Sequence, residues 1–290
     1  MNMQVSKTPK PMQHAPVSLL DVLDVRSLPG DDRFVGIPGE YPMSLLYGGH
    51  LLGQAVAAAL RTVTDDFAAN SLHALFLRAG ELNVPIEYQV TRLRDGRRYV
   101  TRLIEAFQHG KLMLTMTLSA KLPEAGDEHQ PVMPVVRSAQ ELVAEREAAG
   151  IEVRALPMSS YGLQIESLDG FHPASPDFGK PCIAQWLGVK QVAQASLHIR
   201  QAALAYVSDG TMMFNALRPY GSIASSHAAT SLDHALWFHH EVDFAHWILF
   251  DQSSPTATDT RGLNHAHMFA QDGKLIATVM QESMLKRLST

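Results

Sequence analysis

The sequence GGHLLGQAVAAALRTV, residues 48–63, decides the fold that we predict for this chain. From His50 to Val63 it is apolar almost all the way round and is built largely of small side chains. A helix of that composition is buried on most of its sides. The segments that follow it predict strands rather than a second helix, so a sheet must curl around the helix to cover it.

The strands expected after this helix form an antiparallel meander. Between Val84 and Thr91 apolar and polar residues alternate with the period of a half-buried strand. Arg94-Asp95-Gly96-Arg97 predicts a turn between strands. The other expected elements of this half are a helix over 18–25 and strands over 33–37, 72–77, 99–107 and 112–120.

The second half of the chain repeats the first. Three short matches occur in the same order in both halves: 54–58 with 201–205, 73–76 with 234–237, and 109–112 with 272–275. The repeat predicts one fold used twice. We therefore expect a second buried helix over 195–208, strands over 151–156 and 183–189 before it, and further strands after it.

A stretch rich in proline, glutamate and alanine separates the repeats and predicts a linker with one short helix over 139–149. The expected division is an N-terminal domain over 17–122, a linker over 123–150 and a C-terminal domain over 151–290.

Composition excludes several classes of function. The chain has 290 residues, is 46% hydrophobic and carries a formal net charge of -5, which disfavours nucleic acid as a partner. No apolar run approaches the length that spans a membrane, so no membrane insertion is expected. Cys182 is the single cysteine, which precludes an internal disulfide and fits a reducing, cytoplasmic compartment. The first 16 residues predict a loose tail rather than a signal peptide.

Several motifs resemble the acyl-CoA thioesterase II family in their order and spacing. They are GGHLLGQA at 48–55, His73, FLRAG at 76–80, LRDG at 93–96, SLDHALWFH at 231–239 and TVMQE at 278–282. The resemblance runs from about Leu19 to Leu288. It implies an α+β double hotdog fold, in which two central helices are each wrapped by an antiparallel β-sheet and fused in one chain. It also implies hydrolysis of acyl-CoA to free fatty acid and CoA without a cofactor, in a homo-oligomer that is a dimer or tetramer.

The same resemblance implies the catalytic residues. In the family an aspartate, a serine or threonine and a glutamine hold and activate a water molecule, and the matching positions here are Asp209, Ser231 and Gln281. A carboxylate can accept the proton of the water, and a hydroxyl and an amide can orient it. Two departures from the family pattern, Ala79 in place of a proline and Gly210 after the acid, leave the acyl chain length open.

The repeat shows where the chemistry is expected. Aligning the halves places Asp209 on Thr62, Ser231 on Asn70 and Gln281 on Leu118. The first half therefore lacks the acid and the glutamine. We predict one active site, in the second half.

Other residues are candidates for binding the substrate. Backbone N–H groups at the start of the buried helix, at Gly49, can hold an oxyanion. His73 titrates near neutral pH, although His234 in the same place of the other half favours a constraint of the fold. Asp233 and His234 adjoin the site and either support it or are structural. The basic turn of Arg94, Arg97 and Arg98 either meets CoA phosphates or is an exposed hairpin tip.

The sequence disfavours four other functions. The pairs His239/His240 and His265/His267 lack a third ligand at a useful spacing, so no metal is expected. A hotdog hydratase or dehydratase would need a histidine–aspartate pair in a hydratase motif, which the sequence does not contain. A non-catalytic acyl-CoA-binding protein is disfavoured because all three polar residues are retained. The absence of a Gly-x-Ser-x-Gly motif also argues against a covalent serine hydrolase.

Overall fold

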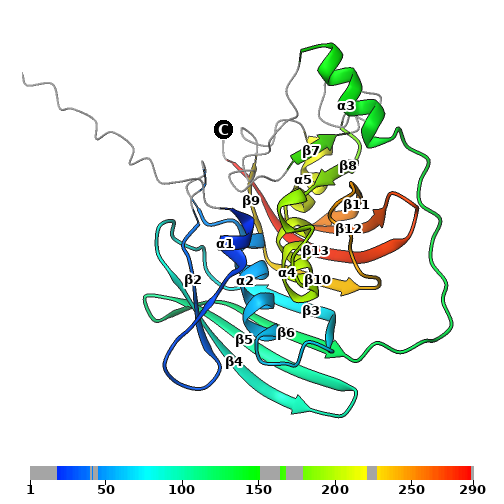
Figure 1. Ribbon diagram of the computed structural model, residues 1–290. Coiled ribbons are helices and arrows are strands. Elements are labelled where there is room, and N and C mark those ends of the chain that lie inside the picture. The colour runs from blue at the N-terminus through cyan, green and yellow to red at the C-terminus, as the bar shows by residue number, and fades with distance from the viewer. Residues whose placement is uncertain are drawn as a thin grey trace, which may run out of the picture.

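The computed structural model describes residues 18–39, 41, 45–150, 164–167, 179–220 and 227–288. These residues form one antiparallel sheet with the strand order β1-β2-β4-β5-β6-β3-β10-β13-β12-β11-β8-β7, and β9 pairs with β13 (Figure 1). Its first-half strands are β1 (Arg26–Ser27), β2 (Arg33–Gly36), β3 (Ala68–Phe76), β4 (Ile86–Asp95), β5 (Tyr99–Gln108) and β6 (Lys111–Lys121). Its second-half strands are β7 (Gln164–Ser167), β8 (Cys182–Gly188), β9 (His227–Ser231), β10 (Asp233–Phe238), β11 (Ile248–Thr258), β12 (Arg261–Ala270) and β13 (Leu275–Arg287).

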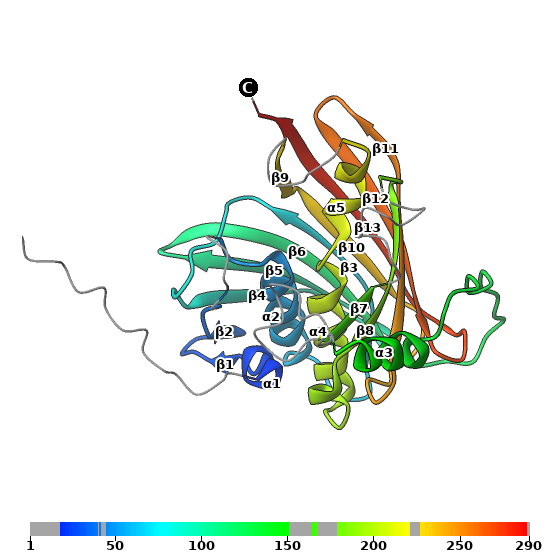
Figure 2. The ribbon, with the colours of Figure 1, turned by 90° about the horizontal axis from the view of Figure 1, so that it is seen from above.

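Two helices, α2 (Gly48–Leu60) and α4 (Leu197–Ser208), lie inside the curl of this sheet (Figure 2). Every residue of α2 from Gly49 to Leu60 is buried, as its small apolar side chains predict. Two further short helices are α1 (Leu19–Leu23), which precedes α2 in the chain, and α5 (Met212–Leu217), which follows α4. The expected helix 50–63 therefore exists, but it begins two residues earlier and ends at Leu60.

The strand order confirms that one arrangement is used twice. Outward from the centre, the first half runs β3-β6-β5-β4-β2 and the second runs β10-β13-β12-β11-β8. The halves join side by side where β3 pairs with β10, with Ala74 opposite His234. The predicted architecture of two buried helices wrapped by antiparallel strands is confirmed. The domain boundaries proposed from the sequence stay a prediction.

The two central helices approach each other closely because α2 carries glycines at positions 49 and 53. A Cβ atom on Gly49 would lie 2.2 Å from the carbonyl oxygen of Tyr206, and one on Gly53 would lie 3.2 Å from that of Ala202. The pairing of Gly49 with Tyr206 and of Gly53 with Ala202 means that the helices run antiparallel. The C-terminal end of α4 is thereby held at the N-terminal end of α2.

Two buried glutamines fasten these helices to the surrounding chain. The amide of Gln201 on α4 donates to the carbonyl of Ala69 and accepts from its N–H, both at 2.9 Å, at the irregular start of β3. Gln54, the matching residue of α2, donates to the carbonyl of Val22 at 2.8 Å and accepts from the hydroxyl of Tyr88 at 3.0 Å. The repeated glutamine is therefore part of the frame of each half.

The linker helix α3 (Ala139–Ala148) packs over the second half of the sheet (Figures 1 and 2). Ala139 and Leu142 contribute to a cluster with Trp186 of β8, whose indole N–H donates to the carbonyl of Arg137 at 2.9 Å. The helix predicted over 139–149 is confirmed, one residue shorter.

One equivalence drawn from the sequence is wrong. His73 is exposed between the buried Leu72 and Ala74, whereas His234 is completely buried. The two histidines therefore point to opposite faces of the sheet, because a shift of one residue along a strand reverses the side-chain direction. The strand expected over 151–156 and the tail of the first 16 residues lie outside the described residues.

We predict that Gly49→Ala destabilises the protein, because the new methyl group must displace the backbone of Tyr206. Overpacking of this kind lowers the free energy of unfolding by about 1–3 kcal/mol. Gly126→Ala is the matched control, since a Cβ atom there meets nothing within 4 Å. Urea denaturation of both variants measures the difference. Equal midpoints for the two variants would show that the helix contact does not need a glycine.

Candidate functional site

The acid predicted from the sequence, Asp209, caps the C-terminal end of α4. It is buried and lies at the N-terminal end of α2, where its Oδ2 would be 2.7 Å from a Cβ atom on Gly48. Burial raises the pKa of the Asp209 carboxyl from its ordinary value of 3.8 to about 6, while contacts with the Gly49 backbone N–H and the Gln281 amide lower it. The positive end of the helix dipole favours an anion at this place.

Gln281 of β13 connects the acid to the predicted serine. Its Nε2 donates a short hydrogen bond to the Oγ of Ser231, and its amide also contacts the Asp209 carboxylate. Within the sheet Gln281 lies opposite Asn264 of β12, whose Nδ2 donates to the Gln281 carbonyl at 3.2 Å. The structure therefore brings together Asp209, Ser231 and Gln281 from a helix end and two strands.

A buried histidine adjoins this group. His234 of β10 has its Nδ1 3.0 Å from the Oε1 of Gln281 and its Nε2 2.9 Å from the Oγ of Ser208. The Nδ1 is also 3.9 Å from the Oδ1 of Asp209. Burial lowers the pKa of the His234 imidazole to about 4, so the ring is neutral at physiological pH.

One carboxylate oxygen of Asp209 lacks a hydrogen-bond donor among the described residues. This atom, the Oδ1, is buried. A buried carboxylate oxygen without a donor is costly, by about 1–3 kcal/mol or more. Because the neighbouring Gln281 and Ser231 side chains are both polar, the arrangement is suited to a water molecule that donates to Asp209.

Other residues proposed for substrate binding lie elsewhere. His73 and Asp233 line a depression of about 310 Å³ that spreads over strands β5, β6, β3 and β10. His73 faces the outer side of the sheet, where its ring packs against that of Trp237 with 5.2 Å between the ring centroids. Asp233 accepts a hydrogen bond from the N–H of Glu282 at 2.6 Å. The structure thus does not bring His73 to the acid, while Asp233 fixes the strand that carries Gln281.

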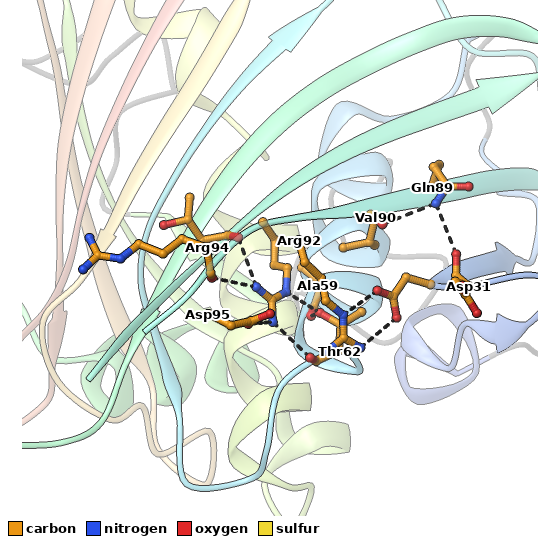
Figure 3. Close-up of polar contacts among 11 residues, drawn as sticks. Asp31, Ala59, Thr62, Gln89, Val90, Arg92, Arg94 and Asp95 are labelled. Atoms are coloured by element: carbon orange, nitrogen blue, oxygen red, sulfur yellow. Dashed lines mark hydrogen bonds and ion pairs between the residues drawn. The ribbon is translucent and has the colours of Figure 1, made fainter. Parts of the chain in front are cut away.

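The basic turn lies at the other end of α2. Arg94, the penultimate residue of β4, has its guanidinium pointing away from the other labelled residues (Figure 3). Arg98 forms an exposed ion pair with Glu124. Arg97 is exposed between the two arginines. The 13 residues of α2 separate this turn from Asp209 by about 20 Å. A contact of these arginines with CoA phosphates stays a prediction.

The first half has a different group at the corresponding place, around Arg102 of β5. Figure 3 labels two of its partners, Thr62 and Asp95. Arg102 lies opposite Leu118 in the sheet, as Asn264 lies opposite Gln281. Its buried guanidinium donates to the Thr62 hydroxyl at 2.7 Å and to Asp95 at 2.5 Å. The places of Asn264 and Gln281 in the second half are thus held in the first half by Arg102, which is ion-paired with Asp95, and by Leu118.

The burial of Arg102 has a signal in the sequence. Val100, Arg102 and Ile104 alternate along one strand and all three are buried. A charged residue in phase with the apolar face of a strand indicates a buried ionic group, since charges are buried only with partners.

The histidine pair considered for metal binding lies together, with 4.6 Å between the ring centroids of His265 and His267. The described residues contain no group of three or more possible ligands.

Comparisons with known proteins give consistent results. A family model described as acyl-CoA thioesterase matches residues 179–284, and one described as acyl-CoA thioesterase N-terminal domain matches residues 37–120. Acyl-CoA thioesterase 2 of Haemophilus influenzae is 31% identical over 255 residues, which are 83% of this chain and 87% of that protein.

Solved structures agree with these matches. The acyl-CoA thioesterase II TesB2 of Mycobacterium marinum superposes with a TM-score of 0.77 at 30% identity, over 93% of this chain and 98% of that one. A hot dog fold protein of Alicyclobacillus acidocaldarius superposes with a TM-score of 0.76 at 17% identity, over 93% and 98% of the two chains, and supports the fold alone. None of the described helices is long and apolar enough to cross a membrane.

The raised pKa of Asp209 predicts a pH-dependent effect of Asp209→Asn on stability. Because the carboxyl has a higher pKa in the folded protein than in the unfolded chain, its favourable contribution is complete below pH 3.8 and is lost as the pH rises through about 6. The neutral amide has no such loss. The variant should therefore melt above the wild type at pH 8, and this advantage should shrink towards pH 5.

Thermal melts at the two pH values measure this effect, with the exposed Asp127→Asn as a control that should show no such trend. A melting temperature of Asp209→Asn that falls below the wild type at pH 8 would contradict a buried, destabilising carboxylate.

Proposed function

The chain belongs to the acyl-CoA thioesterase II family and hydrolyses acyl-CoA, and we propose that it does so by direct attack of a water molecule activated by Asp209. The observation that carries this proposal is the position of Gln281, whose amide contacts both the Ser231 hydroxyl and the Asp209 carboxylate. Three polar side chains that gather at a buried point need a polar partner there. A water molecule at the free Oδ1 of Asp209 meets that need.

In the proposed reaction the water oxygen attacks the thioester carbonyl carbon and transfers a proton to Asp209. Ser231 and Gln281 hold the water in line with the carbonyl. The tetrahedral intermediate then expels the CoA thiolate as the carbon–sulfur bond breaks, and the proton on Asp209 passes to the sulfur. The products are a free fatty acid and CoA, and no covalent enzyme intermediate or cofactor is needed.

The first half of the chain contributes the charge stabilisation. The carbonyl oxygen becomes an oxyanion during the attack and needs donors that are already in place. The N-terminal end of α2, at Gly48 and Gly49, lies beside Asp209 and presents backbone N–H groups with the positive end of a helix dipole. Gly49 is the proposed oxyanion-binding residue, and its N–H, which contacts the Asp209 carboxylate, turns to the oxyanion as the acid takes the proton of the water.

Two other functions fit less well. A hydratase would require an acid or base that delivers a proton to a carbon–carbon double bond, and the buried His234 is held between Ser208 and Gln281 instead. A binding protein without activity would not need an acid whose pKa is raised to about 6 beside a glutamine and a serine. Perturbed acids of this kind are typical of catalytic sites.

We further propose that the enzyme works in the cytoplasm as a homo-oligomer, a dimer or tetramer. The single cysteine fits a reducing compartment. Leu75 is 54% exposed and lies with Leu103 in the depression on the outer face of the sheet, an apolar surface that a second subunit would cover.

The turnover of two variants tests the catalytic proposal. Asp209→Asn should lower kcat by about 10²–10⁴-fold, because a neutral amide cannot accept the proton. Gln281→Leu copies the first-half residue Leu118, so the fold should survive while hydrolysis falls. Thiol release from palmitoyl-CoA and from a short-chain acyl-CoA is the measurement.

Leu118→Gln is the matched control. It should leave turnover unchanged and should not restore the Asp209→Asn protein, since Thr62 and Arg102 occupy the place of the acid and its neighbour. If folded Asp209→Asn and Gln281→Leu proteins both hydrolyse thioesters at nearly the normal rate, the water is activated by other residues.

The assembly is tested separately by light scattering at micromolar concentration, where we expect the mass of a dimer or tetramer. A monomer under these conditions would reject the oligomer without affecting the catalytic proposal.

A further inference from the structure

We propose that His234 is a positioning residue, which acts as the tautomer protonated on Nδ1 and fixes the orientation of the Gln281 amide. The inference rests on the role proposed for Gln281 and extends it to the residue that controls its side chain. His234 does not touch the reacting atoms in this proposal. It acts by deciding which end of the amide faces the acid and the water.

The amide of Gln281 has two ends that differ in chemistry, and only one end suits the site. Its Nε2 donates to the Oγ of Ser231, and the amide also meets the carboxylate of Asp209. If the amide turned over, its oxygen would face an ionised carboxylate and the contact would become repulsive. Catalysis therefore needs the NH2 end towards Asp209 and the oxygen end towards His234.

The contact with His234 can enforce this orientation. The Nδ1 of His234 lies 3.0 Å from the Oε1 of Gln281, so a proton on Nδ1 makes a hydrogen bond to the amide oxygen. A ring protonated only on Nε2 would instead present a lone pair at Nδ1. That lone pair would attract the NH2 end and turn the amide the wrong way.

The other side of the ring can accommodate the tautomer protonated on Nδ1. The Oγ of Ser208 lies 2.9 Å from the Nε2 of His234 and 3.0 Å from the carbonyl of Ala205. A serine hydroxyl has one proton. The carbonyl of Ala205 can only accept, so the Nδ1–H tautomer requires Ser208 to turn its proton from that carbonyl to Nε2. A continuous chain of donors then runs from Ser208 through His234 and Gln281 to Ser231.

The surroundings of His234 keep its imidazole ring neutral. His234 is completely buried, and burial lowers the pKa of its imidazole to about 4. The ionisable group facing it among the described residues is Asp209, with 3.9 Å between Nδ1 and Oδ1.

Three variants of His234 test the proposal. The amide nitrogen of asparagine is as many bonds from Cα as Nδ1 of histidine, so His234→Asn keeps the donor to Gln281. The amide nitrogen of glutamine corresponds to Nε2, so His234→Gln keeps only the contact with Ser208. We expect kcat to be largely retained in His234→Asn and to fall in His234→Gln and His234→Leu, with KM little changed in all three.

A double-mutant comparison separates positioning from general support of the fold. If His234 acts through Gln281, then His234→Leu should lower kcat no further in a protein that already carries Gln281→Leu. Multiplying losses in the double variant would overturn the proposal. So would a His234→Asn protein that is as impaired as His234→Leu.

The tautomer itself can be read in the wild-type protein, and a variant is needed only to assign the signal. Nitrogen-15 spectra of labelled histidine distinguish a ring protonated on Nδ1 from one protonated on Nε2, and the signals missing from His234→Asn identify this residue among the 14 histidines. We expect a neutral Nδ1–H ring throughout pH 5–8. An Nε2–H ring would overturn the proposal.

The failure of this inference differs from the failure of the proposed function. Normal turnover of Gln281→Leu would reject the role of the glutamine. An inactive Gln281→Leu together with an Nε2–H ring would reject only the role of His234.

Discussion

The close approach of α2 and α4 at Gly49 and Gly53 is the constraint on which the rest of this structure depends. It places the C-terminal end of one buried helix against the N-terminal end of the other. Asp209 therefore lies at the positive end of α2, although the acid belongs to the second half of the chain and α2 to the first. A larger residue at Gly49 would separate the charge from the dipole that favours it.

The two halves use the same positions for opposite purposes. In the second half, Asn264 and Gln281 face each other across neighbouring strands and support an acid that is left with a free oxygen. In the first half, Arg102 and Leu118 hold the same places, and the guanidinium uses its donors on Thr62, Asp95 and backbone carbonyls. The second half keeps an unsatisfied carboxylate oxygen beside its pair, whereas in the first half every guanidinium nitrogen of Arg102 has an acceptor.

The sequence predicted the fold well because its strongest signals are periodic. The small apolar residues of α2 and the alternation along β4 and β5 are patterns that local structure alone can explain. The acid and the two polar residues beside it were identified through their match to a family, since nothing in their spacing along the chain brings a helix end at Asp209 to a strand at Gln281.

The errors have equally local causes. The alignment of His73 with His234 was displaced by one residue, and in a strand that displacement moves a side chain to the other face. An irregularity in β3 between Ala69 and Ser71 alters the count of residues in just this strand. Arg102 was not singled out from the sequence, although its phase with Val100 and Ile104 places its charge among the buried side chains of β5.

The junction between β3 and β10 has a consequence for how the site depends on concentration. Each half by itself would present the edge of β3 or β10 with unpaired backbone groups, and two separate chains would have to find each other to complete the acid and its helix dipole. The covalent connection converts that encounter into an intramolecular one, with an effective concentration of about millimolar. The site is consequently assembled once, at folding, and its integrity does not vary with how much of the protein a cell contains.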